Sequence, residues 1–204
     1  MKKTGIFCFF AAVILSSVSC SLLWAPLDGR NNPADPSNNT PTITLTPLLD
    51  GYVANTTPTE TIDFSATTLW INTSPTAVPL IRFDGGEFPR NVVAAELRLW
   101  INASSSVATE IRAHPILEDW SPGTVNWAQV SSDLVPFYDS SNFATAGIAA
   151  GVANVYVVLE VTQIFQRLIE AGNHGFYLEC TAGAMSLHSS RGGNSPKLEI
   201  RGYN

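Results

Sequence analysis

The chain has 204 residues, of which 45% are hydrophobic and 14% are charged, and its formal net charge is -6. The apolar content excludes a disordered chain, and the length favours one globular domain. An acidic chain lacks the basic surface that phosphate binding needs, so we expect no nucleic-acid partner.

An export signal is predicted at the N-terminus. Lys2 and Lys3 form a basic head, and the apolar stretch that follows is too short to span a bilayer. The stretch ends in Ser-Val-Ser-Cys at residues 17–20, which resembles the lipobox of bacterial lipoproteins. We expect residues 1–19 to be a lipoprotein-type signal peptide and Cys20 to be the lipidation site. The protein would then be anchored in the cell envelope, at the outer membrane, or be secreted if cleavage occurs without lipidation.

A tether is predicted at residues 20–48, because this segment is rich in Pro, Asn, Asp and Thr and cannot bury a core. Its acidic residues lack the spacing of a calcium loop, so no metal site is expected there. Cys180 is the one cysteine beyond the tether, which predicts a mature protein without an intramolecular disulfide.

Residues 49–204 are predicted to form an all-β domain, because apolar residues recur there with a period of two. In residues 95–102, for example, Leu97, Leu99 and Ile101 alternate with polar residues and a tryptophan. The same alternation marks residues 69–71, 80–84, 111–113, 155–161, 176–180, 185–187 and 197–201. Turn residues separate these runs, which indicates an antiparallel sandwich or barrel.

One short α-helix is predicted at about residues 162–171, with Thr162 as its N-cap and Gly172 just after its end. Its apolar residues lie on one helical stripe: Ile164, Phe165, Leu168 and Ile169. Residues 134–151 show no clear period and are predicted to form a long loop with at most one short strand.

Four sequence blocks resemble a known domain. Residues 80–84 (LIRFD) and 94–100 (AAELRLW) are similar to the opening "LRFD … ATLRLYV" of DNRLRE domains. Residues 119–127 (DWSPGTVNW) resemble "DWSEGTVTW", and residues 159–178 carry a counterpart of "VDVTSLVQ … NNGLLL". The block at 189–198 resembles "ASREGSNPPRLVV", and together the blocks follow family order from about residue 50 to 203.

The resemblance implies an antiparallel jelly-roll β-sandwich of the type grouped with carbohydrate-binding module family ninety-six. Some members of that family bind acidic polysaccharides such as alginate, and such domains are non-catalytic and use no cofactor. This chain has Pro122 and Gly192 where the family usually has Glu. Any ligand contact made by those two carboxylates in relatives is therefore absent here.

A candidate ligand site follows from strand parity, that is, from the side of the strand to which each alternating residue points. Trp100 points away from the core side of its strand together with Glu96 and Arg98, which combines an aromatic ring with groups that hydrogen-bond sugar hydroxyls or uronates. Trp70 has the same parity, and Tyr177 is expected to extend this platform. The alternative is that loops cover the face, that the aromatic rings are packed, and that Arg98 pairs with glutamates across strands.

No catalytic or metal motif accompanies this site. The three histidines lie in separate blocks without zinc-ligand spacing, and the chain contains no GxSxG motif. We therefore expect a non-catalytic, lipid-anchored envelope protein that binds polysaccharide. A structural or adhesive envelope lipoprotein without a glycan ligand stays open as the alternative.

Overall fold

The structure is a computed structural model, and it describes residues 40–62, 64–74, 76–84, 86, 88–132, 134 and 136–203. The predicted signal peptide, Cys20 and most of the predicted tether lie outside the described residues. Among the residues described, no helix is both long enough and apolar enough to cross a membrane.

The described chain forms eleven antiparallel strands and two helices. The strands are β1 (Thr42–Leu45), β2 (Pro47–Ala54), β3 (Thr68–Thr73), β4 (Thr76–Phe83), β5 (Asn91–Ser104), β6 (Thr109–Pro115), β7 (Ala144–Ile148), β8 (Val155–Glu160), β9 (Phe176–Cys180), β10 (Ala184–His188) and β11 (Lys197–Tyr203). The helices are α1 (Trp127–Val130) and α2 (Thr162–Ala171). The predicted all-β antiparallel class is confirmed.

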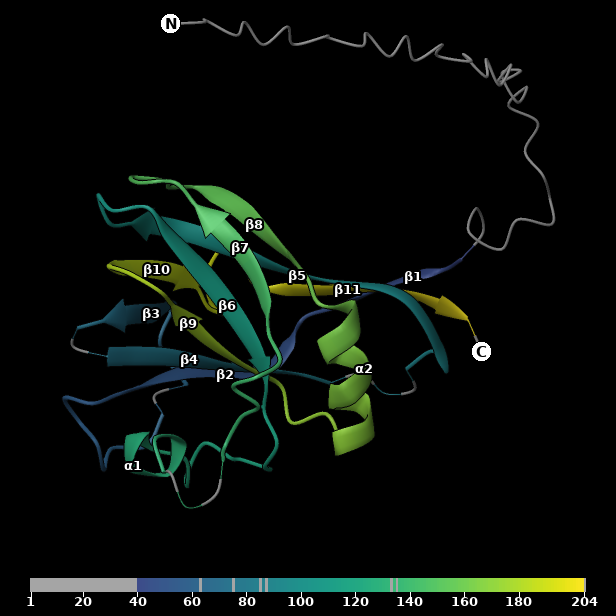
Figure 1. Cartoon of the computed structure of the whole chain (residues 1–204), viewed down its shortest axis with the longest axis horizontal. Coiled ribbons are helices and arrows are strands. Elements are labelled where there is room, and N and C mark those ends of the chain that lie inside the picture. Colours follow the sequence, from purple (N-terminus) through teal and green to yellow (C-terminus); the bar gives the residue numbers. More distant parts are fainter. Residues whose placement is uncertain are drawn as a thin grey trace, which may run out of the picture. The chain divides into compact units, whose positions relative to one another are not determined.

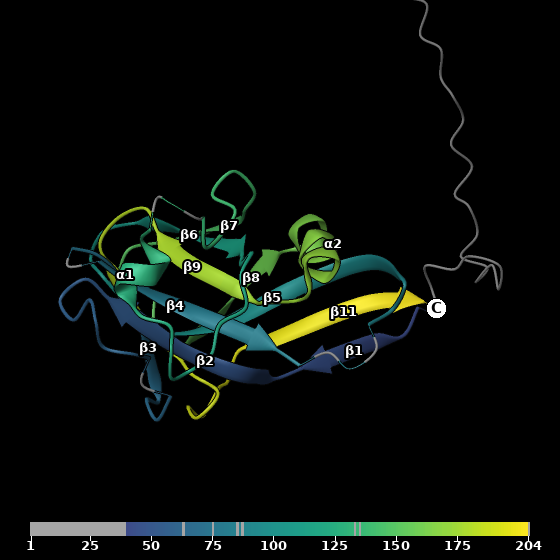
Figure 2. The same cartoon turned by 90° about the horizontal axis from the view of Figure 1, so that it is seen from below.

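All the strands belong to one strongly curled sheet, shown in Figure 1. The hydrogen-bonded order is β1-β11-β5-β10-β3-β4-β9-β6-β7, with β2 added on β4 and β8 added on β5. The long strand β5 pairs with β11 along its first part, with β10 near its end and with β8 on its other edge. In Figure 2, β1, β11 and β5 run side by side, next to β2 and β4.

The main core lies inside the curl, where both halves of the sheet contribute side chains. From β5, Leu97, Leu99 and Ile101 are fully buried, and they meet Ile111 of β6 and Leu178 of β9. The period of two in the sequence is therefore the mark of strands with one face in this core. The other face of β5 points outward.

A second core covers the outer face of β4. Val78 and Leu80 of this strand pack there against Trp120, Val125 and other residues of the segment that carries α1. Both faces of β4 are thus buried, which explains why its sequence is apolar almost without interruption. The two halves of the sheet differ in this respect, because no second core of described residues packs on the outer face of the β5 half.

Helix α2 packs against β5 and β6, and its bounds match the predicted helix. Gly172 ends it in the left-handed conformation with a φ of 107°, as expected. Thr162 is its first residue and does not cap it; its hydroxyl accepts a hydrogen bond from the Ala95 N–H at 2.8 Å. Helix α1 is not predicted by the sequence, because a single turn has no measurable period; its cap is Asn126, which accepts from the Gln129 N–H.

The predicted boundary of the tether needs a correction. Strand β1 starts at Thr42 and β2 at Pro47, both inside the segment assigned to the tether. Thr42 pairs with Arg201 and Leu45 with Leu198, so β1 is held by hydrogen bonds to the end of the chain. Such pairing is non-local and leaves no trace in the composition of a short segment.

Candidate functional site

The candidate site lies on the outer face of the β5 half, a surface made by the outward side chains of β3, β10, β5, β8 and β11. Register brings these side chains together, since Trp100 of β5 lies opposite Tyr156 of β8, and Arg98 lies opposite Lys197 of β11. We call this surface the outer face. It consists of Trp70, Glu96, Arg98, Trp100, Tyr156, His188, Lys197 and Glu199.

Trp100 is the centre of an aromatic group on the outer face. Its ring meets Tyr156 edge to face, with centroids 5.0 Å apart, and lies 6.1 Å from the His188 ring. The Lys197 ammonium sits 5.6 Å from the centroid of Tyr156. Trp100 is partly exposed, so it is supported by its neighbours and also reaches the surface.

Trp70 is the second aromatic ring of the outer face, and 45% of it is exposed. It lies opposite Ser186 of β10, and β10 in turn pairs with β5. Strands β3 and β5 are therefore two strands apart, or about 10 Å at the usual spacing, and Trp100 is displaced further along β5, because Ser186 lies opposite Ala103. Two rings at this separation can contact successive parts of an extended ligand.

Arg98 is already paired within the protein. Its Nη2 atom lies 3.0 Å from Glu96 and 3.0 Å from Glu199, and its Nε atom is buried without a partner among the described residues. Glu160, Glu96 and Glu199 lie side by side on three adjacent strands, and Arg98 offsets their repulsion. The charge of the guanidinium is therefore offset by two glutamates, which is the cross-strand pairing that the alternative expects.

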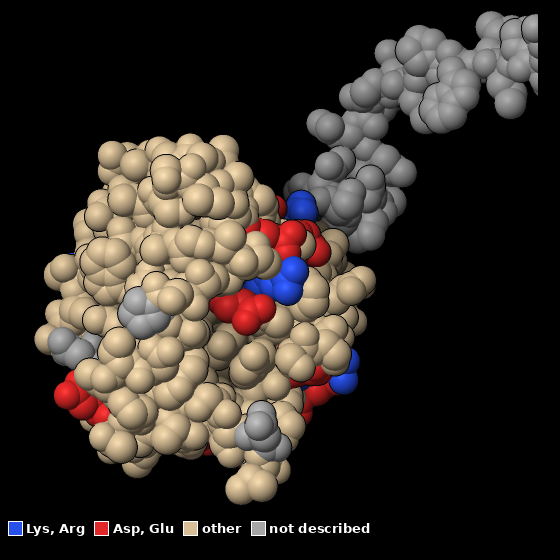
Figure 3. Space-filling view, turned by 60° about the vertical axis from the view of Figure 1, so that its left-hand side comes forward, with Lys and Arg blue, Asp and Glu red and all other residues tan. Residues whose placement is uncertain are grey.

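Ion pairs also lie away from the outer face, for example between Arg82 and Asp119 and between Arg112 and Glu110. On the face of the protein shown in Figure 3, acidic and basic side chains lie next to one another in a few patches, and most of the area carries neither. A surface of this kind offers hydrogen bonds and apolar contact more than a directed charge.

Tyr177 does not join the outer face, which corrects the expectation that it extends the platform of Trp70. It lies on β9, opposite Leu80 of β4, and only 5% of it is exposed. Its ring stacks on Tyr138 at 3.9 Å, and burial raises its pKa well above the ordinary range for tyrosine. Strand parity gives the side of a strand but not the half of the curled sheet to which the strand belongs.

Comparison with known proteins gives the family. The sequence profile of carbohydrate-binding module family 96 matches residues 41–202. The chain belongs to this family. Members of carbohydrate-binding module families are typically non-catalytic and bind glycans. No curated protein matches the chain at a significant level.

The family motifs of the module mostly hold its loops in place. Asp119 of the DWSPG block accepts from Arg82 at 2.6 Å, and Trp120 donates from its indole to the His174 carbonyl at 2.6 Å. In the closing block, Ser190 donates from both its N–H and its hydroxyl to the buried carboxylate of Asp50. These residues are structural, and none of them reaches the outer face.

The histidines of the module lie apart from one another. His114 is buried between Glu179 and the Asp139 carbonyl, and its contact with Glu179 holds the pKa of that carboxyl below its usual range. Among the described residues, no group of three or more His, Cys, Asp or Glu side chains could hold a metal ion.

Four residues of the site were missed by sequence reasoning: Tyr156, His188, Lys197 and Glu199. Tyr156 lies at an outward position in the alternation of its strand, so the sequence could have placed it on the outward side. The pairing of β8 with β5 could not be predicted, because antiparallel neighbours in a jelly roll can be distant in sequence. His188 and Lys197 lie at the ends of their strands, where parity is least certain.

Proposed function

We propose that this protein binds polysaccharide without catalysing a reaction, and that the ligand lies along the outer face. The observation that carries the proposal is the placement of the exposed Trp70 and the partly exposed Trp100 on one outward sheet face, in a chain of a carbohydrate-binding family. Exposed aromatic rings suit the apolar faces of sugar rings, and flanking polar groups fix their orientation.

Hydrogen-bonding groups flank Trp100. The Nδ1 atom of His188 accepts from the Asn194 N–H at 3.1 Å, which leaves the Nε2 atom as the donor of the neutral ring. The Tyr156 hydroxyl lies 3.5 Å from the Ser195 carbonyl, at the weak limit of a hydrogen bond, and can turn to a sugar hydroxyl. With Arg98 held by two glutamates, this arrangement favours uncharged sugars.

Binding to neutral and acidic polymers tests the proposal. Affinity electrophoresis and calorimetry against xylan, cellulose, alginate and pectin should detect binding by the wild type and its loss in Trp100→Ala, with a weaker effect in Trp70→Ala. Circular dichroism verifies folding. Phe143→Ala is the matched control, because Phe143 is 40% exposed and lies on the other half of the sheet.

Normal binding by Trp100→Ala would reject the site. If the wild type bound none of the polymers, the alternative of a structural or adhesive envelope protein would take its place.

The proposal includes a lipid anchor at Cys20 and a location in the cell envelope, at the outer membrane. It is supported by the basic head, the apolar stretch and the lipobox-like residues 17–20. Labelling with a fatty-acid analogue should mark the wild type and not Cys20→Ser, and the variant should move from membranes to the soluble fraction. An unlabelled wild type with a different N-terminus would rule out the anchor.

A further inference from the structure

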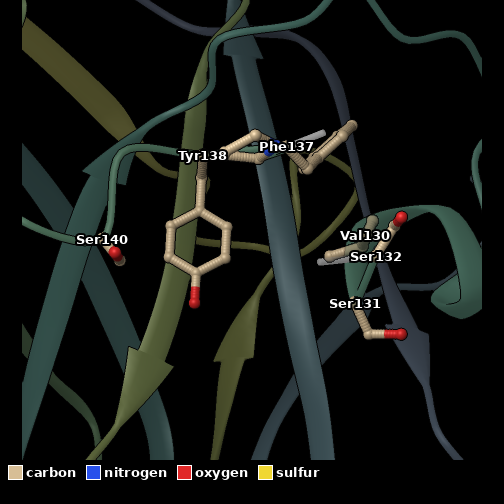
Figure 4. A pocket seen from close by; sticks show the side chains of 7 residues that line it. Val130, Ser131, Ser132, Phe137, Tyr138 and Ser140 are labelled. Atoms are coloured by element: carbon tan, nitrogen blue, oxygen red, sulfur yellow. The ribbon is translucent and has the colours of Figure 1, made fainter. Parts of the chain in front are cut away.

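A hollow lies against Tyr138, on the half of the sheet away from the outer face. It has a volume of about 270 Å³, and Figure 4 labels six of the residues that line it: Val130, Ser131, Ser132, Phe137, Tyr138 and Ser140. This volume is just below the ~300 Å³ at which pockets for drug-sized molecules begin. The hollow therefore suits a small ligand of about one ring.

The ring of Tyr138 is held firmly in this hollow. One of its faces stacks on Tyr177 with centroids 3.9 Å apart and planes at 5°, and His114 meets it edge to face at 5.1 Å. In Figure 4 the ring is seen face on, with Ser140 on one side and Ser131 and Ser132 on the other. A ring fixed in advance loses little freedom when a ligand stacks on it.

Hydroxyl groups surround the ring. The Ser131 hydroxyl donates to the Trp127 carbonyl at 2.8 Å and keeps its acceptor sites, whereas the Ser132 hydroxyl accepts from the Leu134 N–H and keeps its proton to donate. The Ser140 hydroxyl makes no hydrogen bond to another described residue. An aromatic face with donors and acceptors at its rim matches a pyranose, whose C–H faces are apolar and whose edges carry hydroxyls.

Among the residues that the structure describes, none that lines the hollow is charged. Burial raises the pKa of the Tyr138 hydroxyl, so the phenol stays neutral at physiological pH. The described lining therefore offers an ionic ligand no counter-charge, whereas its serine hydroxyls suit a ligand that carries hydrogen-bonding groups.

We propose that this hollow is a second saccharide site, which takes one uncharged sugar ring stacked on Tyr138. The proposal rests on the proposed function, because it assumes that the protein meets polysaccharide. The two sites lie on opposite halves of the curled sheet, so one protein can hold two polysaccharide chains. Where both sites reach one polymer, the linked contacts strengthen binding by up to about 10²–10⁴-fold over a single site.

Calorimetry with neutral hexasaccharides of xylose, glucose and mannose tests this inference. The wild type should bind two molecules, Tyr138→Ala one, Trp100→Ala one, and the double variant none. Ser140→Trp fills the hollow from its exposed rim and should also bind one, so the result does not depend on the folding of Tyr138→Ala. Phe143→Ala is the matched control, because Phe143 also packs on His114, and it should keep both sites.

The outcomes separate the two proposals. A single wild-type site that Trp100→Ala removes would overturn the second site and leave the proposed function intact. A single site that survives Trp100→Ala and is lost in Tyr138→Ala would support the hollow and overturn the outer face. An absence of any binding would overturn both.

Discussion

Gly192 occupies a position where a side chain has no room, and this explains its departure from the Glu of the family. A Cβ atom built there would lie 2.8 Å from the Cβ of His188 and 3.1 Å from the Thr67 carbonyl oxygen. His188 packs against Trp100, so the glycine makes space for a ring of the candidate site.

The substitution Gly192→Ala should consequently be destabilising, by about 1–3 kcal/mol, since an overpacked site must shift its neighbours. Urea unfolding measures the difference. Gly193→Ala is the control, because a Cβ there meets no atom within 4 Å. If both variants unfolded at the same urea concentration, the prediction that a side chain at residue 192 crowds His188 would be wrong.

Glu179 links the pH dependence of stability to one contact. His114 and, more weakly, Arg112 hold the pKa of Glu179 below its usual range. A carboxyl with a lowered pKa in the folded state stabilises the protein above its unfolded pKa of about 4.3, and this contribution is lost as the pH falls through the folded value.

In Glu179→Gln we therefore expect lower stability at neutral pH and a smaller further loss on acidification than in the wild type. Thermal unfolding at pH values from 7 down to 3 measures how the stability of the variant and of the wild type falls with pH. Glu60→Gln changes an exposed carboxylate and should leave the wild-type profile unchanged. Parallel profiles for Glu179→Gln and the wild type would show that the contact has no role in acid stability.

At the scale of elements, strands whose residues alternate were predictable, whereas β2 was not. Strand β5 alternates because one face is in the core, and β9 was predicted with its correct bounds. Strand β2 contains Pro47, Asp50 and Gly51, and it is a strand because it pairs along β4. Its local sequence disfavours a strand, so only the tertiary pairing could reveal it.

Strand β5 allows a direct comparison of its two faces. Leu99 is fully buried in the main core, whereas the side chain of Arg98 is 37% exposed. Leu99→Ala should cost about 2–5 kcal/mol by leaving a cavity. Arg98→Ala should cost less than about 1 kcal/mol, as is usual for a surface ion pair. Chemical denaturation measures both, and equal losses would indicate that the outer face of β5 is covered.

For the whole molecule, the curl of the sheet decides which residues share a surface. Parity placed Trp70, Glu96, Arg98 and Trp100 on outward positions, and the register then brought them to one face. The same reasoning failed for Tyr177, whose strand lies on the covered half. The order of strands in a jelly roll follows from long-range pairing, which a single sequence does not reveal.

The balance of charge over the whole molecule leads to a last prediction. The chain has a formal net charge of -6, and on the outer face Arg98 is held by Glu96 and Glu199. Stacking on neutral sugars involves no charge, so the dissociation constant for a neutral polysaccharide should change by less than about twofold between low and high NaCl. Binding of alginate or pectin should be weak at low salt, where repulsion is least screened. The double variant Glu96→Gln, Glu199→Gln frees Arg98 and should gain salt-sensitive binding of these uronate polymers, measured by affinity electrophoresis. If the wild type preferred uronate polymers at low salt, the pairing of Arg98 would not determine the ligand.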